Sequence, residues 1–232
     1  MMHGLVLAGG EGSRLRASGI TVPKALLSIT GEPQIVRMAA ACRRVGCATV
    51  TCAVRSDLVD LVERATTGLE VHIVGVTTPT SLHTLDIGLR AIEPGNVLCT
   101  LVDTIMPNAQ WDRAHQAAII AFETADAIVA VTPFIEDESP LWVDVTSGSM
   151  VRRFGQAGER RLVTGGVYWL SPRARAIAAA SVAAGVQRIR GFLGALIDQG
   201  ALVQAVEIPR IVDVDTDADI RSALELVGGV AR

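Results

Sequence analysis

The sequence has 232 residues and a mass of 24.4 kDa, which fits one α/β domain of ordinary size. Half of its residues are hydrophobic, 19% are charged, and the formal net charge is −3. This composition excludes a largely disordered chain, and the lack of a basic block gives no support for a nucleic-acid surface. No apolar run approaches the ~20 residues that span a bilayer, and the first strand leaves no room for a signal peptide. We therefore expect a cytoplasmic protein without membrane contact.

The cysteines form no C-x-x-C pair, and no histidines stand at zinc spacing. They fall in apolar runs, which indicates buried, reduced thiols with a structural role. The four positions are Cys42, Cys47, Cys52 and Cys99.

In chain order, strand-like runs alternate with helical ones. The expected strands are 5–7, 49–54, 71–74, 97–102 and 127–131, and the expected helices are 34–45, 57–65, 82–91 and 108–124. Gly46 is placed to end the first helix, and Asp57 and Asn108 are placed to cap two others. Strand–helix units joined by short loops predict a mostly parallel sheet with helices on both faces.

After Pro133 the pattern changes. Short strand-like runs at 141–145, 150–154 and 167–170 predict an antiparallel excursion. The chain returns to strand at 202–208 and 211–214, and it closes with a helix after Thr216. We predict a single Rossmann-like α/β domain in three consecutive parts, residues 1–132, 133–210 and 211–232.

A glycine turn follows the first strand, in the run LVLAGGEGSR at 5–14. The run fits neither a G-x-G-x-x-G fingerprint, because Leu15 takes the third glycine position, nor a Walker A loop. Its chemistry still indicates phosphate binding. Glycines expose backbone N–H groups, Ser13 offers a hydroxyl, and Arg14 and Lys24 bring positive charge. The alternative is a plain turn with two solvated cations.

The run L-V-L-A-G-G-E-G-S-R-L, followed by V-P-K-A-L-L-S-I-T-G-E-P, resembles the signature of NTP-dependent nucleotidyltransferases with a GT-A-like fold. These include the sugar-1-phosphate nucleotidylyltransferases and the phosphocholine-type cytidylyltransferases. The resemblance implies transfer of NMP from an NTP to a phosphomonoester, with release of pyrophosphate. It also implies that 1–132 binds the nucleotide, that 133–210 forms a small antiparallel acceptor-binding lobe, and that 211–232 adds a metal ligand and a helix.

By this resemblance, the first loop and the loop before 82–91 hold the nucleotide. Lys24 would stabilise charge at the α-phosphate, and Glu11 is expected to face solvent. Ser81 is equally placed to cap the helix that follows it. The implied catalytic residues are Arg14, Lys24 and Asp103. The implied nucleotide-binding residues are Leu7, Ala8, Gly9, Gly10, Gly12, Ser13, Arg14, Thr80 and Ser81.

The resemblance further implies a Mg²⁺ ion held by carboxylates. Asp103 directly follows a predicted strand, although Val102 replaces the glycine that usually precedes this aspartate, and a turn-holding role is the alternative. The second ligand comes from the C-terminal D-x-D run, where alternation would place Asp213 and Asp215 on one side of an extended strand. We favour Asp215, with Asp213 as the alternative. Asp217 and Asp219 are interpreted as structural residues in the first turn of the last helix.

Thr164, Gly165, Gly166 and Tyr168 resemble the strand that borders the acceptor pocket in this family, and a simple bulge is the alternative for the two glycines. We expect a sugar 1-phosphate as the acceptor. The alternatives are a cytidylyltransferase that acts on phosphocholine or another phospho-alcohol or phosphonate, and an inactive nucleotide-binding regulatory module. The apolar run 173–186 has two interpretations, a homodimer face or a helix packed into the core. The arginines at 152, 153, 160 and 161 are expected to lie mostly in solvent.

Overall fold

The computed structural model describes residues 1–135 and 139–228. Within these residues a nine-stranded sheet forms the centre, in the order β10-β9-β11-β6-β1-β4-β5, and β8 and β12 continue it from β11. The strands are β1 (Met2–Ala8), β4 (Val50–Arg55), β5 (His72–Val76), β6 (Asn96–Leu101), β8 (Ala127–Thr132), β9 (Trp142–Val145), β10 (Val151–Phe154), β11 (Leu162–Leu170) and β12 (Val203–Glu207).

The sheet is parallel where the nucleotide-binding part was expected and antiparallel at the acceptor-side strands. β1 pairs in parallel with β4 and β6, and β4 pairs in parallel with β5. β11 runs antiparallel to β6, β8 and β9, and β12 runs parallel to β8. The predicted α/β architecture, with a mostly parallel sheet and an antiparallel lobe, is therefore confirmed.

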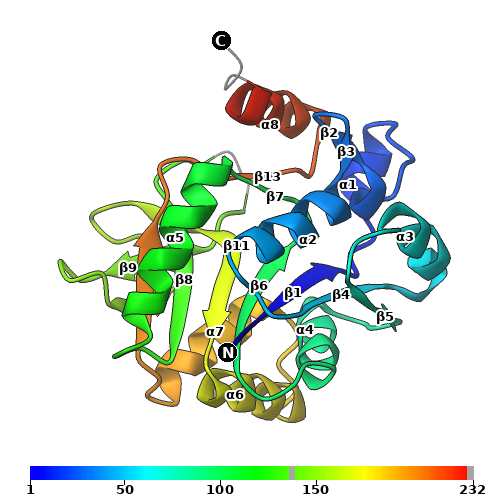
Figure 1. Cartoon of the computed structure of the whole chain (residues 1–232). Helices are drawn as coiled ribbons and strands as arrows, with labels where there is room; N and C mark the ends of the chain where they lie inside the picture. Colours follow the sequence, from blue (N-terminus) through cyan, green and yellow to red (C-terminus); the bar gives the residue numbers. More distant parts are fainter. Residues whose placement is uncertain (136–138, 229–232) are drawn as a thin grey trace.

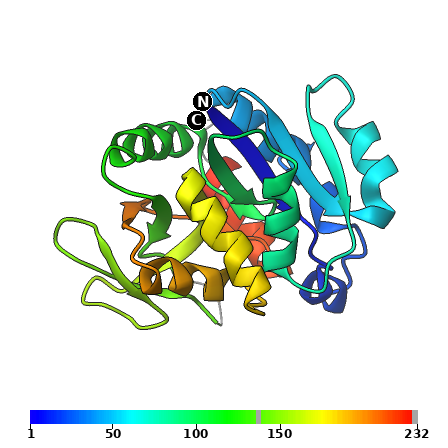
Figure 2. The same cartoon turned by 90° about the horizontal axis from the view of Figure 1, so that it is seen from below.

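Helices cover both faces of the sheet, as Figure 1 and Figure 2 show. In β1, Val6 and Ala8 point into one core, and Leu5 and Leu7 point into the other. This explains the unbroken apolar run, because a strand covered on both faces needs no polar alternation. One core is closed by α2 (Gln34–Arg44), α3 (Val59–Ala65) and α5 (Asn108–Ala121), and the other by α4 (Ser81–Arg90), α6 (Pro172–Ala183) and α7 (Ile189–Asp198).

A third, smaller core lies above one end of the sheet in Figure 1. It joins the start of the chain to its C-terminal part, since Leu15, Ile29, Ile105 and Val214 are all buried in it. The elements that meet there are α1 (Ser13–Ala17), β2 (Ser28–Ile29), β7 (Thr104–Ile105), β13 (Val212–Asp213) and α8 (Asp217–Gly228); β2 also pairs with β3 (Glu32–Pro33). This core positions the functional site described below.

Most predicted elements occur within a few residues of their expected bounds, but two caps were wrong. Pro107 takes the N-cap position of α5, so Asn108 is already the first helical residue, and no side-chain cap bond forms. Asp57 lies in the 3₁₀ turn Ser56–Leu58 and binds Arg55 instead of capping α3. Helices α1 and α7 were not predicted. The ranges 133–210 and 211–232 include residues 136–138 and 229–232, which lie outside the described residues.

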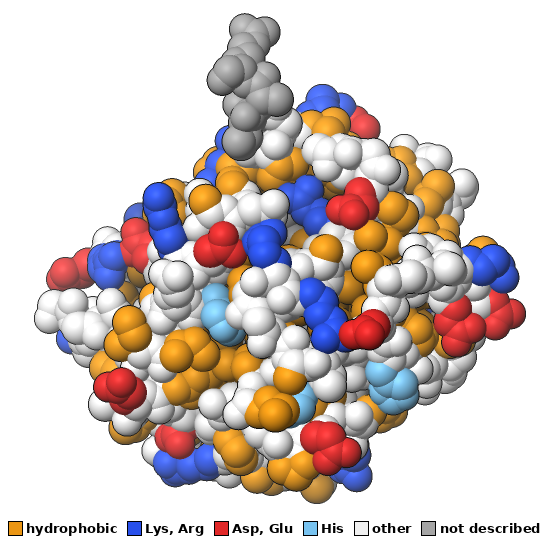
Figure 3. Space-filling model, in the orientation of Figure 1, with side chains coloured by type: hydrophobic (Ala, Val, Ile, Leu, Met, Phe, Trp, Pro, Cys, Tyr) orange, Lys and Arg blue, Asp and Glu red, His pale blue; other side chains and the backbone are white. Residues whose placement is uncertain are grey.

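The remaining expectations concern burial and surface. All four cysteines are buried, and burial raises the pKa of the Cys52 thiol to about 12. Ala174, Ile177 and Ala178 of α6 are buried, which supports the core interpretation of that run, while the homodimer stays a prediction. On the face shown in Figure 3, acidic and basic side chains are interspersed, with no continuous basic patch. No helix among the described residues is long and apolar enough to cross a membrane.

Candidate active site

The glycine turn after β1 forms one wall of a cavity. Gly12 has φ +64°, in the left-handed region that glycine tolerates, and it opens the short helix α1. A Cβ atom on Gly9 would lie 3.0 Å from the Thr84 side chain, so the turn packs directly against α4. Just before the turn, the Leu7 carbonyl of β1 accepts a hydrogen bond at 3.0 Å from the N–H of Val102, the residue that follows β6.

The cavity beside this turn has a volume of 440 Å³. Every residue predicted to bind the nucleotide lines it, and so do the three predicted catalytic residues. The loop on its far side is ordered by hydroxyl contacts, with Thr78 Oγ1 2.6 Å from Thr84 Oγ1. The Ser81 hydroxyl accepts a hydrogen bond from Ile189 N at 3.2 Å, and Thr80 takes the N-cap position of α4. The alternative role of Ser81 as the helix cap is therefore wrong.

Lys24 joins the two aspartates predicted as metal ligands. It follows Pro23, and Nζ donates to an Asp103 carboxylate oxygen and to Asp215 Oδ1, the latter at 2.6 Å. Arg14 contacts the other Asp215 oxygen at 2.6 Å. Burial by itself would lower the pKa of Lys24, but the Asp103 and Asp215 carboxylates outweigh it and raise that pKa above its usual value.

Lys24 is the only lysine in the sequence, and the other 20 of its 21 Lys and Arg residues are arginines. An ammonium group is more compact than a guanidinium group, and its three N–H donors can serve two carboxylates at once. Only 11% of the Lys24 side chain is exposed, so the cluster lies largely out of solvent.

Backbone pairing brings the two carboxylates together from distant parts of the sequence. β13 pairs antiparallel with β7, with Asp213 opposite Thr104, and Val214 N donates to the Asp103 carbonyl at 3.0 Å. The Asp219 carboxylate then accepts hydrogen bonds from Asp215 N at 3.0 Å and Thr216 N at 2.7 Å. This is a capping arrangement at the start of α8, so the structural interpretation of Asp219 agrees with its contacts, and it also fixes the backbone of Asp215.

The Asp103–Asp215 pair has the donor chemistry that Mg²⁺ requires. Asp103 Oδ1 is buried and has no hydrogen-bond partner among the described residues. The described chain contains no group of three or more His, Cys, Asp or Glu side chains able to hold a metal. Mg²⁺ is commonly bound by one or two carboxylates, with substrate phosphates and water completing the octahedron. The residues present therefore fit a magnesium ion that arrives with a phosphorylated substrate.

Asp213 has different surroundings from Asp215. Its Oδ1 accepts a hydrogen bond from Thr104 Oγ1 at 3.2 Å. Burial, reinforced by the negative charge of Asp103, raises the pKa of Asp213 to about 7. β13 ends at this residue, so the alternation expected to place Asp213 and Asp215 on one side of a strand does not continue.

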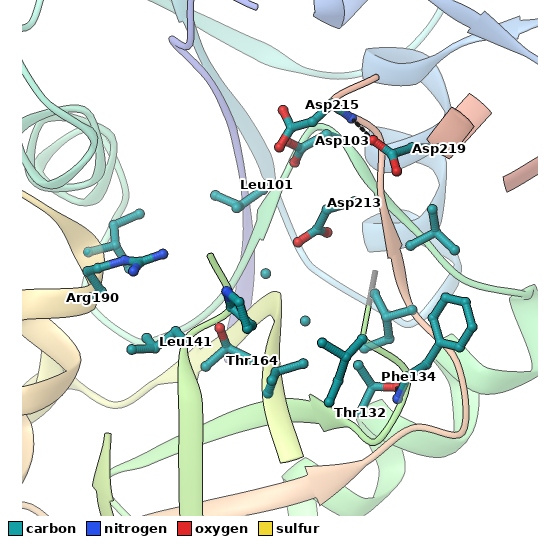
Figure 4. A pocket seen from close by; sticks show the side chains of 18 of the residues that line it. Leu101, Asp103, Thr132, Phe134, Leu141, Thr164, Arg190, Asp213, Asp215 and Asp219 are labelled. Carbon is teal, nitrogen blue, oxygen red and sulfur yellow. Dashed lines mark hydrogen bonds between the residues drawn. The ribbon is translucent and has the colours of Figure 1, made fainter. Parts of the chain in front are cut away.

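A second cavity, of 880 Å³, adjoins the first (Figure 4). Asp103 and Asp215 line both cavities, and Asp213 lines only the larger one. The predicted acceptor residues, Thr164, Gly165, Gly166 and Tyr168, all line it.

The Gly165-Gly166 pair lies in a β-bulge, which was the alternative interpretation of these two glycines. The register between β11 and β8 shifts between Thr164 and Tyr168, and Gly166 has φ +70°. A Cβ on Gly166 would lie 2.5 Å from Thr104 Oγ1, and one on Gly165 would collide with the side chain of Ile211. The glycines are therefore needed for the close approach of β11 to β7 and to the segment before β13.

Sequence reasoning missed several residues of this larger cavity, above all Arg188 and Arg190. Arg190 donates to the Ser139 carbonyl at 3.1 Å. The only sequence signal was the Q-R-I-R run at 187–190, and it went unused because α7 was not predicted. The four arginines that were considered line neither cavity; Arg153 pairs with Asp144 at 3.3 Å, and Arg161 lies over the Trp142 ring. Glu11 is exposed and pairs with Arg16 at 3.5 Å, as expected of a solvent-facing residue.

A family model described as "MobA-like NTP transferase domain" matches residues 4–170, which is well over half of the sequence. The chain belongs to this family. The resemblance to the NTP-dependent nucleotidyltransferases is therefore confirmed, and the protein is a nucleotidyltransferase. No curated protein sequence matched this NTP transferase.

Two solved structures resemble this NTP transferase over nearly its whole length. One is the inositol-1-phosphate CTP transferase from T. maritima, with 18% identity, a TM-score of 0.81 and 98% coverage of each chain. The other is a putative glucose-1-phosphate thymidylyltransferase from Bacillus anthracis in complex with a sucrose. It has 16% identity and a TM-score of 0.84, with 100% of this chain and 97% of that chain covered. At these identities the likeness shows a shared fold, which is the GT-A-like fold expected from the sequence.

Proposed function

We propose that this enzyme transfers a nucleoside monophosphate from an NTP to a sugar phosphate, with release of pyrophosphate and with Mg²⁺ held by Asp103 and Asp215. The observation that carries the proposal is the cluster of Lys24, Asp103 and Asp215, in which both aspartates line the two cavities and Lys24 lines the smaller one. A group can be transferred only where the two substrates meet, which here is the place where the two cavities adjoin. The names of the two structural neighbours, which include a sugar or cyclitol phosphate, agree with this acceptor class.

In this proposal the chain's own residues orient and neutralise the reacting groups. The backbone N–H groups of the glycine turn, together with Ser13 and Arg14, hold the triphosphate. The Lys24 ammonium exchanges its carboxylate partners for the α-phosphate and stabilises the charge that develops there. The acceptor phosphate attacks from the larger cavity, in line with the leaving pyrophosphate, so no covalent enzyme intermediate is needed. Bound Mg²⁺ would supply further charge neutralisation at the phosphates.

The lining of the larger cavity favours a sugar phosphate over phosphocholine. A quaternary ammonium is usually bound by open aromatic faces. Among the described residues, two aromatic side chains line this cavity, those of Phe134 and Tyr168. Arg210 covers the Phe134 ring at 4.2 Å, and Tyr168 is 5% exposed. Arg188 and Arg190 also line the cavity, and their guanidinium groups suit the phosphate of the acceptor.

The turn at Asp103 also concerns the alternative of an inactive binding module, because the absent glycine before Asp103 is one of two features in favour of that alternative; the other is the altered base-binding loop at 77–82. Val102 is 4% exposed, and its backbone N–H donates to the Leu7 carbonyl of β1. The turn after β6 that carries Asp103 therefore forms with valine before the aspartate. The binding-module alternative therefore loses one of its two supports.

The proposal is tested by measuring pyrophosphate release with Mg²⁺ while the NTPs are crossed with sugar 1-phosphates, inositol 1-phosphate and phosphocholine. We expect release with one NTP and a sugar or cyclitol phosphate, and a loss of at least 100-fold in Asp103→Ala, because the metal then has only one carboxylate left. Full turnover by Asp103→Ala would refute the metal assignment. Tight NTP binding without turnover over the whole panel would favour the binding module.

A further inference from the structure

The two aspartates of the C-terminal D-x-D run serve different groups. Asp215 contacts Lys24 Nζ and Arg14, each at 2.6 Å. Asp213 is held by Thr104, and it makes no hydrogen bond to Lys24 within the described residues. Lys24 thus joins Asp215 to Asp103 and leaves Asp213 outside the pair.

The position of Asp213 relative to the two cavities agrees with this division. The smaller cavity, beside the glycine turn, is lined by Asp103 and Asp215 but not by Asp213. Figure 4 shows Asp213 apart from the adjacent Asp103 and Asp215, on the side toward Thr164 and Thr132. Asp213 therefore faces the space where the acceptor would lie.

The contacts of Asp213 indicate what it could bind there. The Thr104 hydroxyl donates to Asp213 Oδ1 at 3.2 Å, and the Gly165 carbonyl, 3.4 Å away, is an alternative acceptor for the same proton, so one carboxyl oxygen of Asp213 faces the protein. No hydrogen bond to its second oxygen is found in the described part of the chain. Carboxyl oxygens accept hydrogen bonds from hydroxyl groups, and a carboxylate repels a phosphate at close range.

The rest of the larger cavity fits a hydroxyl-bearing ring. Thr164 is a polar residue of its lining, and Leu101, Val163 and Ile211 add apolar surface. A mixture of hydroxyl-binding groups and apolar patches suits a polyol, whose ring has polar edges and apolar faces.

We propose that Asp213 is a substrate-binding residue that accepts a hydrogen bond from a hydroxyl group of the acceptor, and that the acceptor is therefore a phosphorylated polyol. The metal then depends on Asp103 and Asp215 alone. This inference rests on the proposed function, because it places the acceptor in the larger cavity.

One experiment measures equilibrium binding without turnover. Glucose 1-phosphate, inositol 1-phosphate and the hydroxyl-free phosphocholine are titrated by calorimetry into the wild type and into Asp213→Ala, Asp213→Asn and Asp217→Asn. We expect the wild type to bind at least one of the two polyol phosphates. Its affinity for phosphocholine should be at least tenfold weaker than its affinity for that polyol phosphate. Asp213→Ala should lose at least tenfold in affinity for the polyol, and Asp213→Asn less, because asparagine keeps an acceptor oxygen. Asp217→Asn is the control, since Asp217 is exposed on α8 and pairs with Arg221.

A second experiment asks whether Asp213 holds the metal. Mn²⁺ binding in the presence of each NTP is followed by electron paramagnetic resonance in Asp213→Asn and Asp215→Asn. We expect Asp213→Asn to stay within twofold of the wild type and Asp215→Asn to weaken at least tenfold.

Several outcomes would overturn the inference: equal loss of Mn²⁺ binding in both variants, polyol binding that is unchanged in Asp213→Ala, or no polyol phosphate bound by the wild type. Failure of the proposed function looks different. In that case the polyol phosphate binds and depends on Asp213, but no NTP yields pyrophosphate with it.

Discussion

Replacement of Lys24 by methionine removes the ammonium between Asp103 and Asp215 while keeping a similar side-chain length. The three side chains are 11%, 14% and 23% exposed, so water screens the remaining carboxylates poorly. Removal of one partner of a buried ion pair costs about 3–5 kcal/mol. Arg14 still contacts Asp215 at 2.6 Å, so we expect the lower end, about 3 kcal/mol. In a chain of 232 residues this corresponds to a fall in Tm of roughly 6–12 °C.

The assay is differential scanning calorimetry of the wild type and Lys24→Met in EDTA, repeated with Mg²⁺ and with Mn²⁺. A divalent cation can replace the missing positive charge, so the gap in Tm should narrow as its concentration rises. Arg16→Met is the matched control, because Arg16 is exposed and its ion pair with Glu11 is 3.5 Å long; its effect should stay within about 0.5 kcal/mol.

The wild-type protein offers an independent readout of the same cluster. Since Lys24 is the only lysine, ¹⁵N-lysine labelling gives a single side-chain ammonium signal. That signal should shift when Mg²⁺ and an NTP are added together. A Lys24→Met variant as stable as the wild type in EDTA, with no response to divalent cations, would refute the idea that the ammonium neutralises this pair.

Two further predictions concern the acceptor side. Because the folded protein raises the pKa of Asp213 from 3.8 to about 7, the unfolded chain loses this proton first as the pH rises, so the free energy of unfolding should fall between pH 4 and 7. In EDTA, Asp213→Asn should reduce that fall, and an unchanged pH profile would contradict the pKa shift. Gly166→Ala should lower the free energy of unfolding by about 2–3 kcal/mol, through its positive φ and the close Thr104 hydroxyl. Gly194→Ala should raise it by up to about 1 kcal/mol, because that helical position has open space around it; urea denaturation checks both, and equal effects would contradict the packing argument.

The nucleotide side of the site was predictable because its determinants are local in sequence. The glycine turn directly follows β1, and Asp103 lies two residues after the end of β6, so the carboxyl ends of two parallel strands bring them to the same edge. The motif also identified Lys24 and Asp215. What it did not give was their contact, which depends on pairing between β7 and β13 across a long stretch of chain.

The acceptor side was less predictable because it depends on how α7 packs. Arg188 and Arg190 reach the larger cavity only through the position of that helix, whose sequence was not interpreted as helical. The two wrong caps have a local cause. Asn108 and Asp57 have suitable side chains, but Pro107 starts α5 one residue early, and Arg55 engages the Asp57 carboxylate.

The pairing of β13 with β7 also determines when, during synthesis, the site becomes complete. Asp215 follows Lys24 by 191 residues, so the glycine turn, Lys24 and Asp103 leave the ribosome long before the second carboxylate exists. Contacts between such distant segments form late, because a long loop must close before they stabilise the chain. A nascent chain can therefore contain the glycine turn, Lys24 and Asp103 while it still lacks Asp215, which lines the nucleotide cavity and is one of the two proposed metal ligands. Under the proposed function, consumption of NTP then begins only when nearly the whole protein has been made.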